Sequence, residues 1–159
     1  MDSHTVILET PIGALAVTGS EAGISEIRFL DEPASPSDTI PPELAEGVRQ
    51  LTEYFAGQRR EFTFELAPRG TPFERRVWAH VSEIPYGETR TYLQLAEALG
   101  DPKTIRAVGR ANGRNPLPIV VPCHRVIGSS GDLVGYGGGL WRKEWLLAHE
   151  GRPTQQPLF

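Results

Sequence analysis

The sequence predicts an α+β protein with two domains, residues 1–68 and 69–159. Residues 4–30 contain short alternating apolar segments separated by turn residues, which is typical of an antiparallel sheet. Residues 72–113 contain helical segments that each begin at a capping residue. The charge also changes between the two parts: residues 1–68 hold 4 Lys or Arg against 12 Asp or Glu, a net charge of −8, whereas residues 69–151 hold 11 against 8, a net charge of +3.

The first domain is predicted to be a small α/β unit. "TVILET", "GALAVTG" and "GISEIRFL" are predicted strands, with turns at "PIG" and "SEAG". After a proline-rich loop, "ELAEGVRQLTEYFAG" places Leu44, Val48, Leu51 and Phe55 at helical spacing, and Gly57 fits the C-terminal cap of that helix. "EFTFEL", residues 61–66, is predicted to be one more strand. "APRG", at residues 67–70, is a plausible boundary because composition and charge both change there.

The second domain is predicted to begin with three helices. Their capping residues are Thr71 with Glu74, Thr91 with Gln94, and Asp101 followed by Pro102. The first helix is expected over residues 72–82, while Gly100 and Gly113 end the second and the third. The two short helices joined through Gly-Asp indicate a helix-turn-helix.

The second helix of this motif has an unusually bare surface. Ala107, Gly109 and Ala111 leave little side chain, while Arg106 and Arg110 lie one turn apart. Each interior glycine costs a helix about 1 kcal/mol against alanine, so something should approach closely here. Two explanations fit these small residues, tight packing on another helix and insertion into a nucleic-acid groove. The residues of this helix, taken alone, favour tight packing.

Positive charge is concentrated around this helix, but charge alone favours an ordinary solvated surface over a phosphate-binding one. Residues 101–125 contain one acidic residue and five basic residues, which are Lys103, Arg106, Arg110, Arg114 and Arg125.

The remaining segments alternate between strand, loop and helix. "RNPLPIVVPCHRVIG" is predicted to be strand-like despite its prolines, and "GDLVGYGGG" is a glycine-rich loop around Tyr136. "LWRKEWLLAHEG" predicts an amphipathic helix in which Leu140, Trp145 and Leu147, together with Trp141, pack inward.

Cys123 is the only cysteine, so an internal disulfide and a multi-cysteine zinc site are both excluded. A lone cysteine is more often a small buried apolar side chain than a nucleophile. A nucleophile needs a base or a field that favours the thiolate, for which His124 and Arg125 are candidates, and an orienting group such as Glu150. Neighbours in a regular strand point to opposite faces, so Cys123 and His124 cooperate only if Pro122 bends the chain or a water bridges them.

Five segments in one order resemble the O6-alkylguanine-DNA alkyltransferases. They are "IPYGETRTY", "RAVGRANGRNP", "PCHRVIG", "GYGGG" and "KEWLLAHEG". The resemblance is dense over residues 70–151 and looser before them, chiefly in "TPIGALAVTG" and "LTEYFAG". It implies a winged helix-turn-helix-like C-terminal domain that carries the active site. It also implies a methylated-DNA–protein-cysteine methyltransferase that transfers the alkyl group from O6 of a flipped guanine to its own cysteine and is thereby inactivated.

The resemblance implies catalytic roles for five residues. Cys123 matches the acceptor thiol, His124 the residue that takes the thiol proton through water, and Glu150 the carboxylate that orients that histidine. Asn115 matches the asparagine that braces the active-site turn. Tyr92 matches the tyrosine that donates a proton to N3 of the leaving guanine.

The resemblance also implies DNA contacts from the bare helix and from the loops. Arg106 would fill the vacated place in the base stack, and Tyr136 would cover the flipped base. The carbonyl oxygens of Cys123 and Val126 would accept from the exocyclic amine. The helix would lie in the minor groove, where small residues permit close approach and little sequence is read; the residues expected there are Ala107, Gly109, Arg110 and Ala111.

The expected partner is double-stranded DNA containing O6-alkylguanine, bound by a monomer, with cooperativity along DNA left open. No cofactor, no metal and no membrane contact are expected, and the expected location is the cytoplasm, with the nucleoid. Two positions depart from some family members, Gly137 after the loop tyrosine and Asn112 in the wall formed by the recognition helix, so the range of alkyl groups stays open.

Three alternatives are distinguishable by experiment. A lesion binder related to the alkyltransferases would flip the base without transfer, although such proteins lack the acceptor cysteine that is present here. A helix-turn-helix regulator would bind one duplex sequence and ignore a modified guanine. A cysteine hydrolase built on Cys123, His124 and Glu150 would turn over a small ester or amide.

Overall fold

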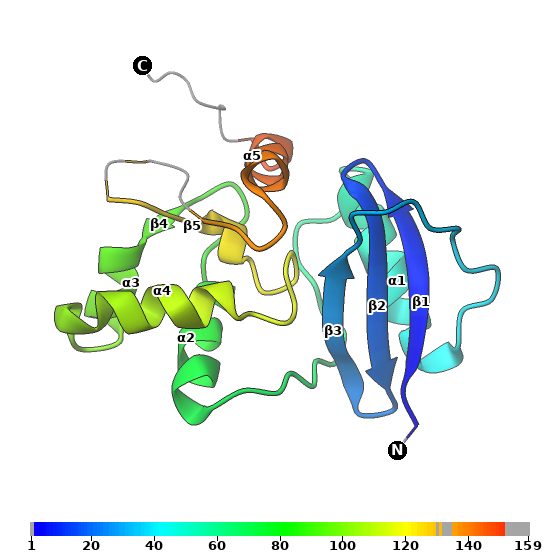
Figure 1. The fold of residues 1–159 in the computed structure, drawn as a ribbon, viewed down its shortest axis with the longest axis horizontal. Coiled ribbons are helices and arrows are strands. Elements are labelled where there is room, and N and C mark those ends of the chain that lie inside the picture. The colour runs from blue at the N-terminus through cyan, green and yellow to red at the C-terminus, as the bar shows by residue number, and fades with distance from the viewer. Residues whose placement is uncertain (1, 130, 132–134, 152–159) are drawn as a thin grey trace. The chain divides into compact units, whose positions relative to one another are not determined.

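The computed structural model describes residues 2–129, 131 and 135–151. The chain divides into two compact units between Arg69 and Gly70. One unit holds a sheet and a helix, and the other holds mainly helices (Figure 1), so the predicted α+β class is confirmed. Within the described residues, no helix is both long enough and apolar enough to span a bilayer.

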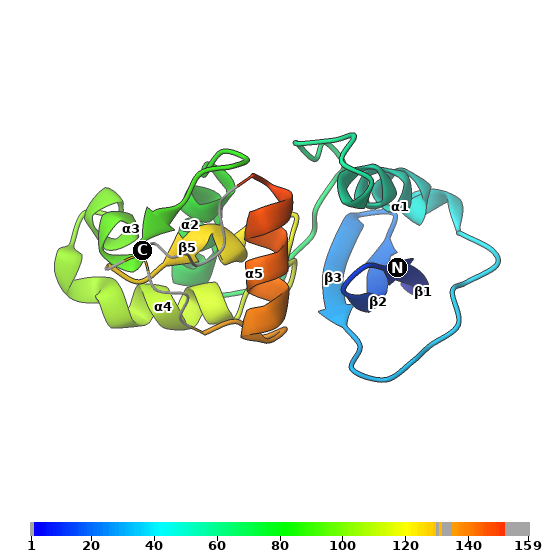
Figure 2. The same ribbon diagram turned by 90° about the horizontal axis from the view of Figure 1, so that it is seen from above.

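The first unit is a three-stranded antiparallel sheet covered by one helix. Strands β1 (His4–Thr10), β2 (Gly13–Ser20) and β3 (Gly23–Phe29) pair antiparallel, as predicted, and are adjacent in chain order. Helix α1 (Pro42–Phe55) lies along one face of this sheet (Figure 2) and ends before Gly57, whose φ of 78° suits the predicted cap. The buried face of α1 is rotated from the predicted one, because Gln50 and Tyr54 are buried while Val48 and Phe55 are half-buried.

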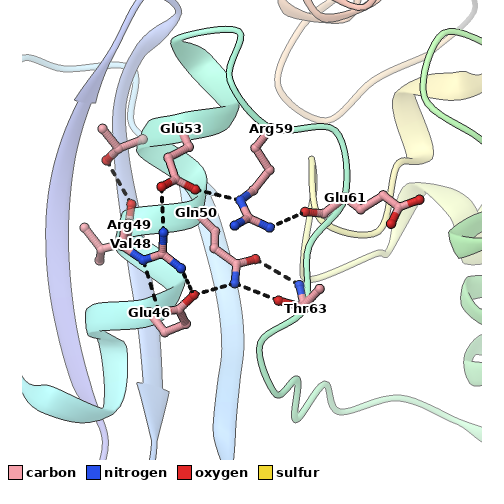
Figure 3. Close-up of polar contacts among 9 residues, drawn as sticks. Glu46, Val48, Arg49, Gln50, Glu53, Arg59, Glu61 and Thr63 are labelled. Carbon is pink, nitrogen blue, oxygen red and sulfur yellow. Dashed lines mark hydrogen bonds and ion pairs between the residues drawn. The ribbon is translucent and has the colours of Figure 1, made fainter.

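The strand predicted at residues 61–66 is wrong. Only Leu66 forms an isolated bridge, with Ile24 of β3. The segment is fixed instead by the buried amide of Gln50, whose Oε1 accepts from Thr63 N at 2.9 Å and whose Nε2 donates to Thr63 Oγ1 at 2.8 Å (Figure 3). Phe62 packs on the Tyr54 ring of α1, with ring centroids 5.5 Å apart. The alternation of apolar and polar residues in "EFTFEL" therefore results from aromatic packing onto α1, because the backbone of residues 61–64 pairs with no strand.

The second unit begins with the predicted helices. They are α2 (Pro72–Ser82), α3 (Tyr92–Ala98) and α4 (Ile105–Gly113), with a short 3₁₀ turn, η1 (Pro102–Thr104), before α4. Both predicted capping boxes are present, at Thr71 and at Thr91. The helix expected to begin at Pro102 has a 3₁₀ first turn, where the Asp101 carboxylate accepts from Lys103 N at 2.9 Å. Helix α4 packs against both α2 and α3, which forms the helix-turn-helix.

The strand predicted over residues 114–128 is wrong except at its end. Strand β5 (Val126–Ile127) is two residues long and runs parallel to β4 (Arg90–Thr91). Three prolines remove backbone donors before it, and Ile119 has a φ of 78°, which is incompatible with extended backbone. Ile119 and Val121 of the β-branched run are nevertheless buried, so they supply core side chains without strand pairing.

The last helix, α5 (Leu140–His149), differs from prediction in its inward face. Leu147 is buried, as expected, and Trp145 is half-buried, but Leu140 and Trp141 are exposed at 48% and 57%. Arg142 and Lys143 are buried in their place. Arg142 and Lys143 can be buried because the guanidinium and the ammonium group each donate to a backbone carbonyl oxygen.

Candidate active site

Cys123 lies on a sharp bend rather than on a strand. Pro122 has φ −80° and ψ 65°, and Cys123 N donates to Val121 O at 2.7 Å, which is an inverse γ-turn. The 3₁₀ turn η2 (Cys123–Arg125) follows at once. Pro122 thus bends the chain, so the opposite-face geometry of a strand does not separate Cys123 from His124.

Two asparagines support this turn. Asn115 Nδ2 donates to Val121 O at 2.7 Å, and Asn115 Oδ1 accepts from Leu117 N at 2.9 Å, so one amide fixes both ends of the loop 117–121 that leads into Pro122. Asn112, on the buried face of α4, donates from Nδ2 to Cys123 O at 3.3 Å. From the sequence, Asn112 is expected only as a departure in the pocket wall. Asn112 shares the apolar face of α4 with Val108 and Ala111, and this spacing is the signal that predicts a polar side chain directed inward.

His124, Arg125 and Glu150 form one buried cluster. His124 Nε2 lies 2.8 Å from Glu150 Oε2, while Arg125 donates from Nε to Oε1 at 2.7 Å and from its second terminal nitrogen to Oε2 at 2.9 Å. The remaining terminal nitrogen of Arg125 donates to Ile84 O at 2.6 Å. The carboxylate that the sequence placed after the last helix therefore does meet the histidine, and Arg125 joins both.

The pKa values in this cluster follow from burial and pairing. Burial alone would raise the pKa of Glu150, but hydrogen bonds from His124 and Arg125 outweigh it and hold that pKa well below its ordinary value. Burial lowers the pKa of His124 against the opposing effect of Glu150, so the imidazole is neutral at pH 7. Because Glu150 is an ionised acceptor, the proton of the neutral ring resides on Nε2, and Nδ1 is an acceptor. This Nδ1 is buried and has no hydrogen-bond partner within the described residues.

The thiol itself is buried and protonated at rest. Cys123 is 7% exposed, and burial raises the pKa of its thiol, although hydrogen bonding with Asn115 and the charge of Lys143 act in the opposite direction. The positive charge of Arg125 is paired with Glu150 rather than directed at the sulfur. A nucleophilic thiolate must therefore be generated when the substrate is in place, by proton transfer to a nearby base.

Lys143 is a second buried polar group with no predicted role. Its Nζ donates to Val126 O at 2.7 Å and to Gly135 O at 3.4 Å, so it joins β5 to the backbone beside Tyr136. Tyr136 is half-buried, and burial raises the pKa of its phenol well above the ordinary value. Residues 132–134 of the predicted glycine-rich loop lie outside the described residues. A lysine in an otherwise apolar helix face gives no clear sequence signal, because its carbonyl partners are distant in the chain.

Tyr92 and Arg106 line one open pocket of about 350 Å³ between α3, α4 and the end of β5. Burial raises the pKa of the Tyr92 phenol, although hydrogen bonding with Asn112 opposes the shift. A Cβ at Gly109 would lie 3.9 Å from the Tyr92 ring, so the glycine leaves space at this wall without being required by it.

The DNA-contact residues expected on α4 divide between two faces of the helix. Arg106 and Arg110 are exposed, and Ala107 and Gly109 are half-buried beside them. Ala111 lies on the opposite face, 2% exposed, and its carbonyl oxygen accepts from Trp78 Nε1 of α2 at 2.8 Å. The close approach at Ala111 is therefore helix packing, and the structure does not bring this residue to the arginine face.

The chemistry available at this site is nucleophilic. Cys123 and His124 lie on one buried turn, and Glu150, at the end of α5, reaches His124 from outside that turn. Tyr92 is connected to the turn through Asn112. In the described part of the chain, no three His, Cys, Asp or Glu side chains gather so as to hold a metal ion.

Comparisons with known proteins match both units. Residues 4–68 match the model of the 6-O-methylguanine DNA methyltransferase ribonuclease-like domain, and residues 72–152 match the model of the 6-O-methylguanine DNA methyltransferase DNA-binding domain. The chain is 51% identical over 158 residues to the methylated-DNA–protein-cysteine methyltransferase of Mycolicibacterium paratuberculosis, with 96% of each chain covered. The corresponding protein of Methanosarcina acetivorans is 48% identical, with 93% of this chain and 98% of that one covered.

Solved structures give the same match. The crystal structure of Mycobacterium tuberculosis O6-methylguanine methyltransferase has a TM-score of 0.83 and 47% identity over 94% of this chain and 93% of that chain. A structure of Mycobacterium tuberculosis OGT in complex with DNA has a TM-score of 0.83 and 48% identity over 92% of each chain.

Proposed function

Because the chain belongs to the 6-O-methylguanine DNA methyltransferase family, we propose that Cys123 is the residue that accepts the alkyl group from O6 of guanine. The resemblance found in the sequence is confirmed, and the protein repairs DNA by direct transfer of the alkyl group to a cysteine of its own. One observation carries the assignment of the residue: the sequence contains a single cysteine, so the acceptor can be no other.

His124 takes the proton of the thiol during the attack. Its buried Nδ1 is an acceptor with no protein partner among the described residues, and a polar site of this kind is usually satisfied by an ordered water. A water between the sulfur and Nδ1 would carry the proton to the ring. The imidazolium formed in this way is stabilised by Glu150 at 2.8 Å.

The leaving guanine needs a proton as its bond to the alkyl carbon breaks. In the step proposed here, a sulfur–carbon bond forms, the carbon–O6 bond breaks, and Tyr92 donates to guanine N3. The hydrogen bond between Asn112 and Tyr92 supports this role, since a donor to the phenolic oxygen stabilises the phenolate that remains. Val126 O is held by Lys143 at 2.7 Å and accepts from the exocyclic amine, while Tyr136 covers the flipped base and Asn115 braces the turn.

The product is a thioether, which is a poor leaving group, and the chain has no second thiol to release it. One protein molecule therefore repairs one lesion. The partner is duplex DNA containing O6-alkylguanine, bound by a monomer with the arginine face of α4 toward the minor groove.

Intact-protein mass spectrometry tests this proposal. The protein is mixed with an excess of duplex containing one O6-methylguanine, and any adduct is located by peptide mapping. We expect the mass of one methyl group on Cys123, saturating at one per protein. Unmodified protein that still binds the lesion would instead favour a lesion binder, and turnover of a small ester would favour a hydrolase.

Arg106→Ala is expected to slow repair of duplex DNA more than reaction with free O6-alkylguanine base. The exposed arginine lines the Tyr92 pocket, from which it can fill the stack vacated by the flipped base and offset part of the few kcal/mol that flipping costs. The measurement compares single-turnover rates with duplex and with free base.

Arg110→Ala is the matched control on the same exposed face. This variant should weaken duplex binding and reduce its salt dependence, because Arg110 contacts only phosphates in this proposal. Equal slowing of duplex and free-base reactions by Arg106→Ala would remove the stack-filling role.

A further inference from the structure

Arg125 has a place in the site that neither its sequence position beside His124 nor its charge predicts. Its side chain is 7% exposed and is paired with the carboxylate of Glu150. Two of its nitrogens meet the two oxygens of one carboxylate at 2.7 and 2.9 Å, and a third meets Ile84 O at 2.6 Å. This is a bidentate pair with both charges removed from water, fixed at the far side by the backbone.

We propose that Arg125 is a positioning residue that holds Glu150 as a buried carboxylate and thereby keeps His124 a neutral imidazole with a free lone pair on Nδ1. The proposal rests on the proposed role of His124 as the proton acceptor. Arg125 does not touch the substrate in this arrangement, and it acts only through the carboxylate that it shares with the histidine.

The charge balance of the cluster carries the argument. With His124 neutral, Arg125 and Glu150 together have no net charge, so protonating the ring would bury an uncompensated positive charge. Without Arg125 the same carboxylate would face His124 alone, and protonating the ring would then complete an ion pair at 2.8 Å. The protonated ring would have no acceptor on Nδ1 and could not take the thiol proton.

Other charged groups around His124 do not replace Arg125. Lys143 of α5 is a second cation that acts on the ring, and its ammonium donates to Val126 O and Gly135 O. Cys123, on the same turn, is a neutral thiol at rest, and Tyr136, whose phenol acts on Glu150 and Cys123, is neutral as well. Helix α2 also packs against η2, but its buried side chains are apolar and bring no charge.

The first test uses the unsubstituted protein and an NMR titration of the ¹⁵N-labelled imidazole of His124. We expect a neutral ring at pH 7, protonated on Nε2 and bare on Nδ1. An imidazolium at pH 7 would overturn the proposal without any variant having to fold.

The second test compares Arg125→Gln, which keeps a hydrogen-bond donor but not the charge, with Arg125→Lys, which keeps the charge. In Arg125→Gln the His124 titration moves to higher pH. The single-turnover rate of methyl transfer at about pH 6 falls on the order of tenfold, because one pH unit changes the neutral fraction tenfold, and it recovers at about pH 9. Arg125→Lys should keep the pH profile of methyl transfer seen in the unsubstituted protein. Both variants lose the bidentate contact, so a merely structural role of Arg125 would change both profiles alike.

The outcomes separate this proposal from the one on which it rests. An unmoved His124 titration in Arg125→Gln overturns the role of Arg125 whatever the rates are. A titration that moves while the transfer profile stays fixed supports control of His124 by Arg125, and it then counts against His124 as the proton acceptor.

Discussion

Cys123→Ala should abolish alkyl transfer completely while leaving lesion binding within about twofold of the unsubstituted protein. The chain contains no other thiol, so no residue can replace the acceptor. Binding should persist because the groups that approach the base, Tyr92 and Arg106, lie on α3 and α4 and are not held by the cysteine side chain. The measurement is mass spectrometry for transfer together with fluorescence anisotropy for binding to a duplex with one O6-methylguanine.

The small side chain makes this substitution mild for the fold. Removing one sulfur from a buried position costs about 1 kcal/mol or less when the site relaxes. The turn itself is held by the backbone hydrogen bond from Arg125 N to Pro122 O and by the side-chain amide of Asn115. Cys123→Ser is the matched variant, because it keeps a hydroxyl at the bend but is a poor nucleophile without a stronger base. Methyl transfer by Cys123→Ala at the original rate would exclude Cys123 as the acceptor.

Local sequence rules predicted the elements that depend on local interactions. The hairpin strands and the capping boxes at Thr71 and Thr91 are set by residues within a few positions of one another, so pattern and cap chemistry suffice. The segments that failed are fixed from a distance. Gln50 holds residues 61–66 through Thr63, thirteen positions away, and no local period records that contact.

The site divides in the same way. The bend at Pro122 was a stated condition for cooperation between Cys123 and His124, and the order of residues made Glu150 a candidate partner of the histidine. The roles of Asn112 and Lys143 were not predicted, because each acts on a backbone carbonyl of a distant segment. Every residue has a backbone carbonyl, so the sequence does not show which carbonyl accepts a side-chain hydrogen bond. The hydrogen-bond partners of Asn112 and Lys143 on apolar helix faces therefore could not be predicted from the pattern of residues.

Glu150→Gln should lower the free energy of unfolding by about 3–5 kcal/mol near pH 7. The carboxylate is 1% exposed and accepts from both His124 and Arg125, so removing its charge leaves the arginine buried and unpaired. Urea unfolding of the full chain, followed by the signals of the tryptophans, all of which lie in the second unit, measures the change. Glu144→Gln is the matched control, because Glu144 is exposed on α5 and should change stability by less than about 0.5 kcal/mol.

The pH dependence of the free energy of unfolding gives a second check on the role of Glu150. Its pKa is lowered in the folded protein, so the unfolded chain binds a proton more readily than the folded one does as the pH falls below about 4.3, the ordinary value for a glutamate. The stability that Glu150 contributes is therefore complete above that pH and is lost progressively below it. The difference in unfolding free energy between the unsubstituted protein and Glu150→Gln should shrink as the pH falls from about 6 to about 3. A difference that stays constant over this range would mean that the glutamine change acts through packing and not through the carboxylate charge.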